Sequence, residues 1–125
     1  MVLPALERGR YEYRKQVAFG NRLGGKGRHF VDAVASKDGI KTLISLKWQQ
    51  TSGTAEQKVP FEIMCLADVV RTGEASRAYL VLGGDGWSLR DFYVSGALRD
   101  HLIHASLVDV VTLEAFIRLA NNGQL

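Results

Sequence analysis

An aspartate and a lysine mark the stretch of the chain where chemistry is most easily placed. Asp32 lies in an apolar segment six residues before the pair Asp38-Gly39, and Lys47 ends a second apolar segment eight residues after it. Asp-Gly between two such segments predicts a tight hairpin, which brings Asp32 and Lys47 to the same end of two paired strands. An aspartate beside a lysine there is either an isolated ion pair or part of a metal-dependent hydrolytic site. In such a site the lysine orients a water or stabilises charge on the attacked phosphate.

The segment after the hairpin offers carboxylates that could complete a magnesium site. Ser45 and Lys47 lie two residues apart, so they share one face of the second strand. Mg2+ prefers one or two carboxylates with backbone oxygen and water, and Glu56 and Glu62 both follow. The two glutamates fall on opposite flanks of an apolar stripe at helical spacing, so a continuous helix would not easily turn both toward one metal. We favour Glu62, which lies beyond Pro60, and keep Glu56 as the alternative. A solvated acid near a helix start is the other interpretation of each.

The elements that must position these residues follow from periodicity and turn signals. Toward the N-terminus we expect a helix over 3–20, a glycine-rich loop over 20–29, and strands over 29–36 and 40–48. A capping box that begins at Thr54 predicts a helix ending at Gly73. Beyond it we expect strands over 77–84 and 106–113 and helices over 88–103 and 113–121. The order α-β-β-α-β-α-β-α predicts one α/β domain over residues 1–125, with a mixed sheet flanked by helices.

The hairpin residues resemble the signature of a known family. Asp32, twelve intervening residues and then Ser45-Leu46-Lys47 resemble the motif of the PD-(D/E)XK nuclease superfamily, which has an acid on one hairpin strand and acid-x-lysine on the next. Gln49 matches a glutamine often found two residues after the family lysine. Many members place a helix bearing a glutamate before the hairpin, where Glu12 (or Glu7) fits. The resemblance implies a restriction-endonuclease-like fold with an α-β-β-β-α-β core, completed here by strands 77–84 and 106–113.

Two positions depart from the family pattern. Val31 stands where a proline often precedes the aspartate, and Ser45 stands at the position of the second acid. Serine is a poor magnesium ligand. However, a subgroup of type II restriction enzymes has Ser-x-Lys at this point and takes the missing carboxylate from the following helix. The present sequence is similar to that arrangement if Glu62 supplies the carboxylate.

The resemblance implies a Mg2+-dependent endonuclease that hydrolyses phosphodiester bonds of DNA. The metal, Mg2+ or Mn2+, would be held by Asp32, Glu62 and the Leu46 carbonyl, with Glu56 as the alternative carboxylate. Lys47 would position the attacking water and stabilise the developing charge. The same site would include Ser45 and Gln49, and Glu12 would hold a second metal or a water.

Charge is unevenly spread along the chain. The first 28 residues carry seven lysines and arginines against two acids, whereas the whole chain has a net charge of only +3. A basic end on a near-neutral body suits a polyanion such as DNA, although a solvated helix face is an equal alternative on charge alone. The residues that we expect to contact nucleic acid are Arg14, Arg22, Lys26, Arg28 and Gln50. One site cuts one strand, so cleavage of both strands of a duplex calls for a homodimer.

Composition argues against several other classes. A hydrophobic fraction of 46% and a charged fraction of 23% are ordinary for a globular domain. No apolar run approaches the ~20 residues that span a bilayer, and the start lacks the layout of a secretory signal. Cys65 is the single cysteine, and the three histidines are scattered, which predicts no Cys/His metal cluster. The glycine-rich loop lacks the ending of a P-loop. We therefore expect a cytoplasmic protein that uses neither a membrane nor a nucleotide cofactor.

Two other functions stay open at this point. In a catalytically inactive nuclease-fold module that binds DNA, Ser45 would mark a lost metal site, and DNA binding would not depend on Mg2+. In a subunit of a larger nucleic-acid-processing complex, the basic N-terminus would be a protein-docking arm, and the chain would show no affinity for DNA at low salt.

Overall fold

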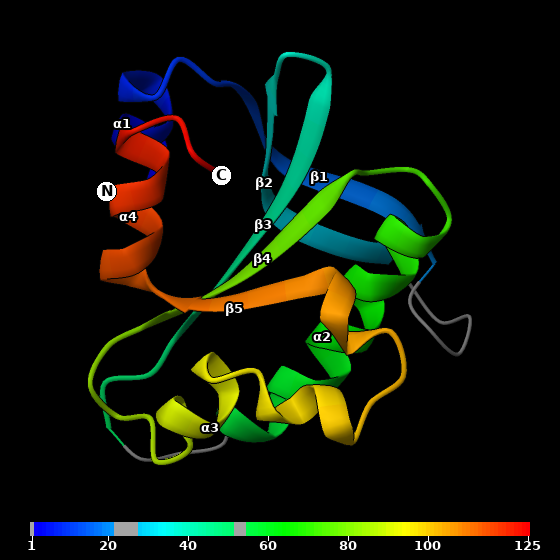
Figure 1. The fold of residues 1–125 in the computed structure, drawn as a ribbon, viewed down its shortest axis with the longest axis vertical. Helices are drawn as coiled ribbons and strands as arrows, with labels where there is room; N and C mark the ends of the chain where they lie inside the picture. Colours follow the sequence, from blue (N-terminus) through cyan, green and yellow to red (C-terminus); the bar gives the residue numbers. More distant parts are fainter. Residues whose placement is uncertain (1, 22–27, 52–54) are drawn as a thin grey trace.

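Five strands form one mixed sheet in the order β1-β2-β3-β4-β5 (Figure 1). The structure is a computed structural model that describes residues 2–21, 28–51 and 55–125. β1 and β3 lie antiparallel to β2, whereas β4 and β5 continue parallel to β3. In chain order the elements are α1 (Val2–Arg8), β1 (Glu12–Asn21), β2 (Arg28–Lys37), β3 (Ile40–Trp48), α2 (Ala55–Arg71), β4 (Arg77–Gly83), α3 (Arg90–Val94), two short 3-10 turns (Ala97–Asp100 and Ala105–Leu107), β5 (Val108–Thr112) and α4 (Leu113–Asn121).

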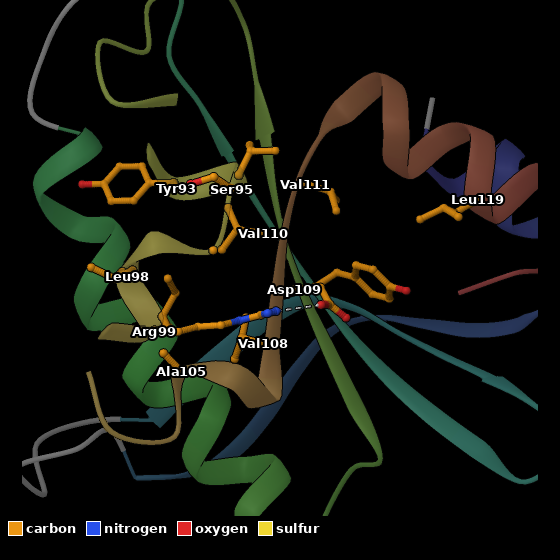
Figure 2. Close-up of a pocket in the computed structure, with 14 residues that line it drawn as sticks. Tyr93, Ser95, Leu98, Arg99, Ala105, Val108, Asp109, Val110, Val111 and Leu119 are labelled. Carbon is orange, nitrogen blue, oxygen red and sulfur yellow. Dashed lines mark hydrogen bonds and ion pairs between the residues drawn. The ribbon is translucent and has the colours of Figure 1, made fainter. Parts of the chain in front are cut away.

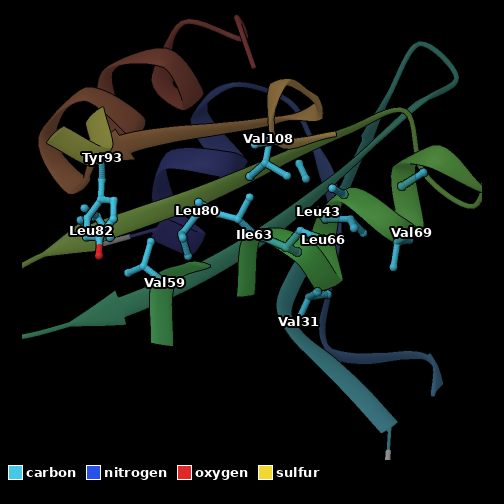
Figure 3. Packing of buried hydrophobic residues seen from close by; sticks show 14 of the residues in the cluster. Val31, Leu43, Val59, Ile63, Leu66, Val69, Leu80, Leu82, Tyr93 and Val108 are labelled. Atoms are coloured by element: carbon cyan, nitrogen blue, oxygen red, sulfur yellow. The ribbon is translucent and has the colours of Figure 1, made fainter. Parts of the chain in front are cut away.

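Helices cover both faces of the sheet and create two buried clusters. On one face α2 packs Val59, Ile63 and Leu66 against Leu43 and Leu80 of the sheet, as Figure 3 shows. On the other face α1 and α4 lie together, and their Leu6 and Phe116 pack with Ile44 and Val81. Leu43 and Ile44, which are neighbours on β3, point into different clusters, as strand alternation requires. The expected mixed sheet flanked by helices in a single domain is confirmed.

Pro60 lies inside α2, where the chain replaces the hydrogen bond that proline removes. Proline has no N–H to donate to the carbonyl four residues earlier, which here belongs to Glu56. The hydroxyl of Tyr93 donates to that carbonyl at 3.0 Å. The helix therefore runs unbroken from Ala55 to Arg71, and the expected helix with its apolar stripe is confirmed. Thr54, the expected first residue of the capping box, lies outside the described residues.

The N-terminal helix expected over 3–20 is wrong beyond its first turns. α1 ends at Arg8, and Gly9 follows at a point where a Cβ atom would collide with the backbone oxygen of Ala120. Arg10 then takes a positive φ of 64°, which turns the chain into β1. Because β1 adds a third antiparallel strand, the observed order opens α-β-β-β-α-β. This is the order that the family resemblance implies, reached through a strand that the sequence pattern did not reveal.

The helix expected over 88–103 is also wrong. α3 covers only Arg90–Val94, and Gly96 has a φ of 82°, which a regular helix does not allow. The strands expected over 29–36, 40–48 and 77–84 are confirmed with small shifts at their ends, and the strand expected over 106–113 shortens to β5. The closing helix over 113–121 is confirmed. In the described part of the chain, no helix combines the length and apolar character needed to cross a bilayer.

The alternation of β2 breaks at Asp32. Val31 belongs to the cluster under α2, whereas Ala33 belongs to the cluster under α1 and α4. Regular alternation would put both on one face, because they are two residues apart. On the neighbouring strand β1, Lys15 pairs with Ala33 and Val17 pairs with Val31, so Gln16 lies opposite Asp32. Gln16 has a positive φ of 52°. Both strands thus change face at this point, which turns the start of β2 toward α2.

Candidate active site

Glu62 of α2 meets the end of β3 at Ser45 and Lys47. Its Oε1 accepts a hydrogen bond from Ser45 Oγ at 3.3 Å, and its Oε2 lies 3.5 Å from Lys47 Nζ. Ser45 and Lys47 share the face of β3 that carries Leu43, and this face packs against α2. Glu62 directly precedes the buried Ile63, which fixes its place on the helix. The structure therefore brings together Ser45, Lys47 and Glu62, which the sequence analysis assigns to one site.

Asp32 reaches the same strand from the other side of the hairpin. The backbone pairing of β2 with β3 ends at Ala33 and Ile44, and beyond it Asp32 Oδ2 accepts the N–H of Leu46 at 2.6 Å. The N–H and C=O of one residue in an extended strand point to the same edge, so the Leu46 carbonyl faces the side of Asp32. The carboxylates of Asp32 and Glu62 are thus bonded to adjacent residues of β3.

Glu62 is held as a carboxylate although it is largely buried, with 13% of its side chain exposed. Burial raises the pKa of Glu62, but the hydrogen bond from His29 and the charge of Lys47 together lower that pKa below its usual range. His29 Nε2 lies 2.7 Å from Glu62 Oε1. Because the carboxylate is ionised and can only accept, the imidazole nitrogen must be the donor.

The oxygens at this end of the hairpin are of the chemical type that hard divalent cations bind. In the described ranges, no group of three or more His, Cys, Asp or Glu side chains is arranged to hold a metal ion. Mg2+ does not need such a group, since it keeps several waters and binds through one or two carboxylates. The exposed Asp32, the ionised Glu62 and the Leu46 carbonyl supply oxygen ligands of that kind.

Glu56, the alternative carboxylate, holds a loop instead. Its Oε1 accepts the backbone N–H of Ser88 and that of Leu89, the latter at 3.2 Å. The side-chain amide of Gln49 donates to the same oxygen at 3.5 Å and to the Gly86 carbonyl at 2.7 Å. Gln49 is 6% exposed. Glu56 and Gln49 therefore latch the loop before α3 onto the ends of β3 and α2, so the structure places Gln49 in this latch rather than beside Glu62.

Glu12 does not lie on a helix. It is the first residue of β1, paired with Ser36 and close to the Asp38-Gly39 turn. That turn is at the opposite end of the hairpin from Asp32, because Ser36 lies four residues further along β2. The expectation of a helical glutamate that holds a second metal or a water beside Asp32 is corrected by this placement.

The residues expected to contact nucleic acid are spread over the sheet. Arg14 is exposed on β1 opposite Val34, and Arg28 is exposed at the start of β2. Gln50 is exposed just after β3. Arg22 and Lys26 lie outside the described residues.

His29 is the site residue that sequence reasoning missed. Regular alternation along β2 places it with Ala33, on the face away from α2, so no pattern linked it to Glu62. The break at Asp32 reverses that expectation and buries His29 against Glu62, with 5% of the residue exposed. The only available signal was its closeness to Asp32 in the sequence.

A hollow of about 330 Å³ lies elsewhere, along the β5 edge of the sheet. Figure 2 shows Tyr93, Leu98 and Val110 on its walls, with Arg99 pointing to Asp109. The Arg99 Nη2 and Asp109 Oδ1 atoms are 3.4 Å apart. Asp32, Lys47 and Glu62 do not line this hollow, so it is separate from the carboxylate site.

Comparisons with known proteins bear on the family and the fold. The family model of a PD-(D/E)XK nuclease superfamily domain matches residues 2–124. A crystal structure titled as a protein of unknown function, AF1548, is similar with a TM-score of 0.57 and 16% sequence identity. The likeness covers 90% of this chain and 54% of that one, so the chain spans about half the length of the solved structure, and the likeness shows the fold alone. No curated protein matches the sequence.

Proposed function

Because the chain belongs to the PD-(D/E)XK nuclease superfamily, we propose that it is a metal-dependent endonuclease that hydrolyses phosphodiester bonds in DNA. The observation that carries the proposal is the contact of Glu62 with both Ser45 and Lys47, beside an Asp32 that is bonded to Leu46. These contacts support a role for the α2 carboxylate in place of the acid that the family motif has on the strand.

Each residue of the site has a role that follows from its contacts. Asp32, Glu62 and the Leu46 carbonyl would hold Mg2+ or Mn2+, which when bound supplies Lewis-acid polarisation of the phosphate and of a coordinated water. Ser45 and Lys47 orient the Glu62 carboxylate from two sides. Lys47 keeps 29% of its side chain exposed, so its ammonium can also meet a phosphate and stabilise charge on it.

DNA is the proposed substrate on grounds of charge. Seven lysines and arginines against two acids in the first 28 residues give an N-terminal region suited to a phosphate backbone. Arg28 is exposed on β2, the strand that carries Asp32, and Arg14 is exposed on the neighbouring β1. A homodimer would supply a second site for the second strand of a duplex.

A cleavage assay tests the proposal. Single-stranded, duplex and branched DNA are incubated with Mg2+, with Mn2+ and with EDTA, using the unaltered chain and the Asp32→Asn, Lys47→Ala and Glu62→Ala variants. We expect cleavage with metal only, and its loss in all three variants. Lys58→Ala is the matched control, because Lys58 is an exposed residue of α2, and this variant should cleave normally.

Two results would overturn the proposal. Binding of DNA that is independent of metal and never leads to cleavage would identify an inactive DNA-binding module. Failure to bind DNA at low salt would favour a subunit that docks on proteins.

A further inference from the structure

His29 and Lys47 contact different oxygens of the Glu62 carboxylate. His29 Nε2 lies 2.7 Å from Glu62 Oε1, whereas Lys47 Nζ lies 3.5 Å from Oε2. Only 7% of the His29 side chain is exposed. The break in β2 at Asp32 is what brings this imidazole to α2.

Oε1 and Oε2 of Glu62 differ in what they can still accept. A carboxylate has four lone-pair sites, two on each oxygen. Oε1 already accepts from His29 and from Ser45, whereas Oε2 faces Lys47. The oxygen with acceptor capacity left for a cation is therefore Oε2.

The second imidazole nitrogen indicates that this contact, rather than space filling, is the reason for a histidine. His29 Nδ1 is buried and has no hydrogen-bond partner among the described residues. An unpartnered polar nitrogen in the interior is unfavourable, and an apolar side chain would fill the same space without that penalty. The bond to Glu62 is what the imidazole adds.

We propose that His29 is a positioning residue, which occupies Oε1 of Glu62 and so directs Oε2 toward the divalent cation. The inference rests on the proposed function, because it assumes that Glu62 is a metal ligand. Partners that orient a metal ligand typically change metal affinity by about 10–100-fold when they are removed.

The test is direct titration of Mn2+ into the DNA-free protein, followed by electron paramagnetic resonance of the unbound ion. His29→Leu removes the donor and keeps an apolar side chain. His29→Gln keeps an amide nitrogen at about the reach of Nε2, and His29→Asn has an amide that stops near the position of Nδ1. We expect the Kd for Mn2+ to rise about 10–100-fold in the Leu and Asn variants and to stay within a few-fold of the unaltered value in the Gln variant. His101→Leu, a change at an exposed histidine, is the control.

The outcomes separate this inference from the proposed function. Unchanged Mn2+ affinity in His29→Leu, or equal weakening in the Gln and Asn variants, would overturn the positioning role alone. Absence of Mn2+ binding to the unaltered protein would overturn the proposed metal site and this inference with it. Circular dichroism checks that each variant is folded. If His29→Leu does not fold, the comparison of Mn2+ affinity between His29→Gln and His29→Asn decides whether His29 is a positioning residue.

Discussion

Lys47 Nζ lies 3.5 Å from Glu62 Oε2, so the cation near the end of β3 is paired with a carboxylate from the next helix. The same carboxylate accepts a hydrogen bond from Ser45, two residues before the lysine. Because Glu62 is largely buried, the cost of desolvating the two charges offsets much of their attraction, so stability alone is a weak reason for the pair. The pair instead places a negative oxygen beside Lys47 in a chain that has serine where the family motif has an acid.

Moving the carboxylate from α2 to β3 should move the metal ligand with it. We expect Glu62→Gln to lower the single-turnover cleavage rate by at least about 100-fold, a loss typical of a removed catalytic electrostatic contact. Adding Ser45→Asp to that variant should recover about 10-fold or more, since position 45 already touches the Glu62 carboxylate. No recovery in a double variant that folds normally would count against the idea that Glu62 replaces the strand acid.

Glu56 should matter for stability rather than for metal binding. Glu56→Ala removes the acceptor for the N–H groups of Ser88 and Leu89, and a typical hydrogen bond contributes about 0.5–1.5 kcal/mol to stability. Urea denaturation should show a loss approaching that size, whereas the Mg2+ concentration for half-maximal cleavage should stay unchanged. A normal unfolding midpoint with abolished cleavage would instead identify Glu56 as the metal ligand.

The Tyr93 hydroxyl makes stability sensitive to alkaline pH. Burial, with a smaller contribution from the charge of Glu56, raises the pKa of Tyr93 above its usual 10.0. A group whose pKa is raised by folding stabilises the protein fully below its unfolded pKa, and this stability is lost as the pH rises through the folded pKa. The stability difference between the unaltered chain and Tyr93→Phe should therefore be constant up to about pH 9 and shrink above about pH 10. Urea denaturation of both proteins across that range measures it, and a difference that grows above pH 10 would have the wrong sign.

Salt dependence should reveal which cations meet phosphates. If Arg14 and Arg28 each contact one phosphate, replacing either with alanine should reduce the slope of log Kd against log salt by about 1. Fluorescence anisotropy with duplex DNA and EDTA measures binding without cleavage. Arg71→Ala is the control, since Arg71 pairs with Asp68 near the end of α2. An unchanged slope in both variants would place the DNA path elsewhere.

Much of the site followed from local patterns. The Asp38-Gly39 turn predicts the hairpin, and alternation along β3 predicts that Ser45 and Lys47 share one face. Helical spacing in the next segment then predicts that an acid of α2 can contact both residues. Glu62 was favoured over Glu56 because it lies beyond Pro60, and the structure places Glu62 in contact with both strand residues.

The rest depended on tertiary contacts that no local pattern encodes. The scarcity of glycine and the early Pro4 predict one helix over 3–20, whereas β1 forms in that range through its pairing with β2. The irregularity at Gln16, which has a φ of 52°, lies opposite Asp32 on β2, where the change of face brings His29 to α2. The latch of Gln49 and Glu56 depends on backbone groups of a loop that lies more than thirty residues further along the chain.

Anomalous diffraction from crystals grown with Mn2+ tests the central claim most directly. The account predicts one strong peak beside Lys47, bonded to Asp32, to Glu62 Oε2 and to the Leu46 carbonyl, and its loss in Glu62→Gln. A protein that cleaves DNA in solution but binds Mn2+ away from these three oxygens would contradict it.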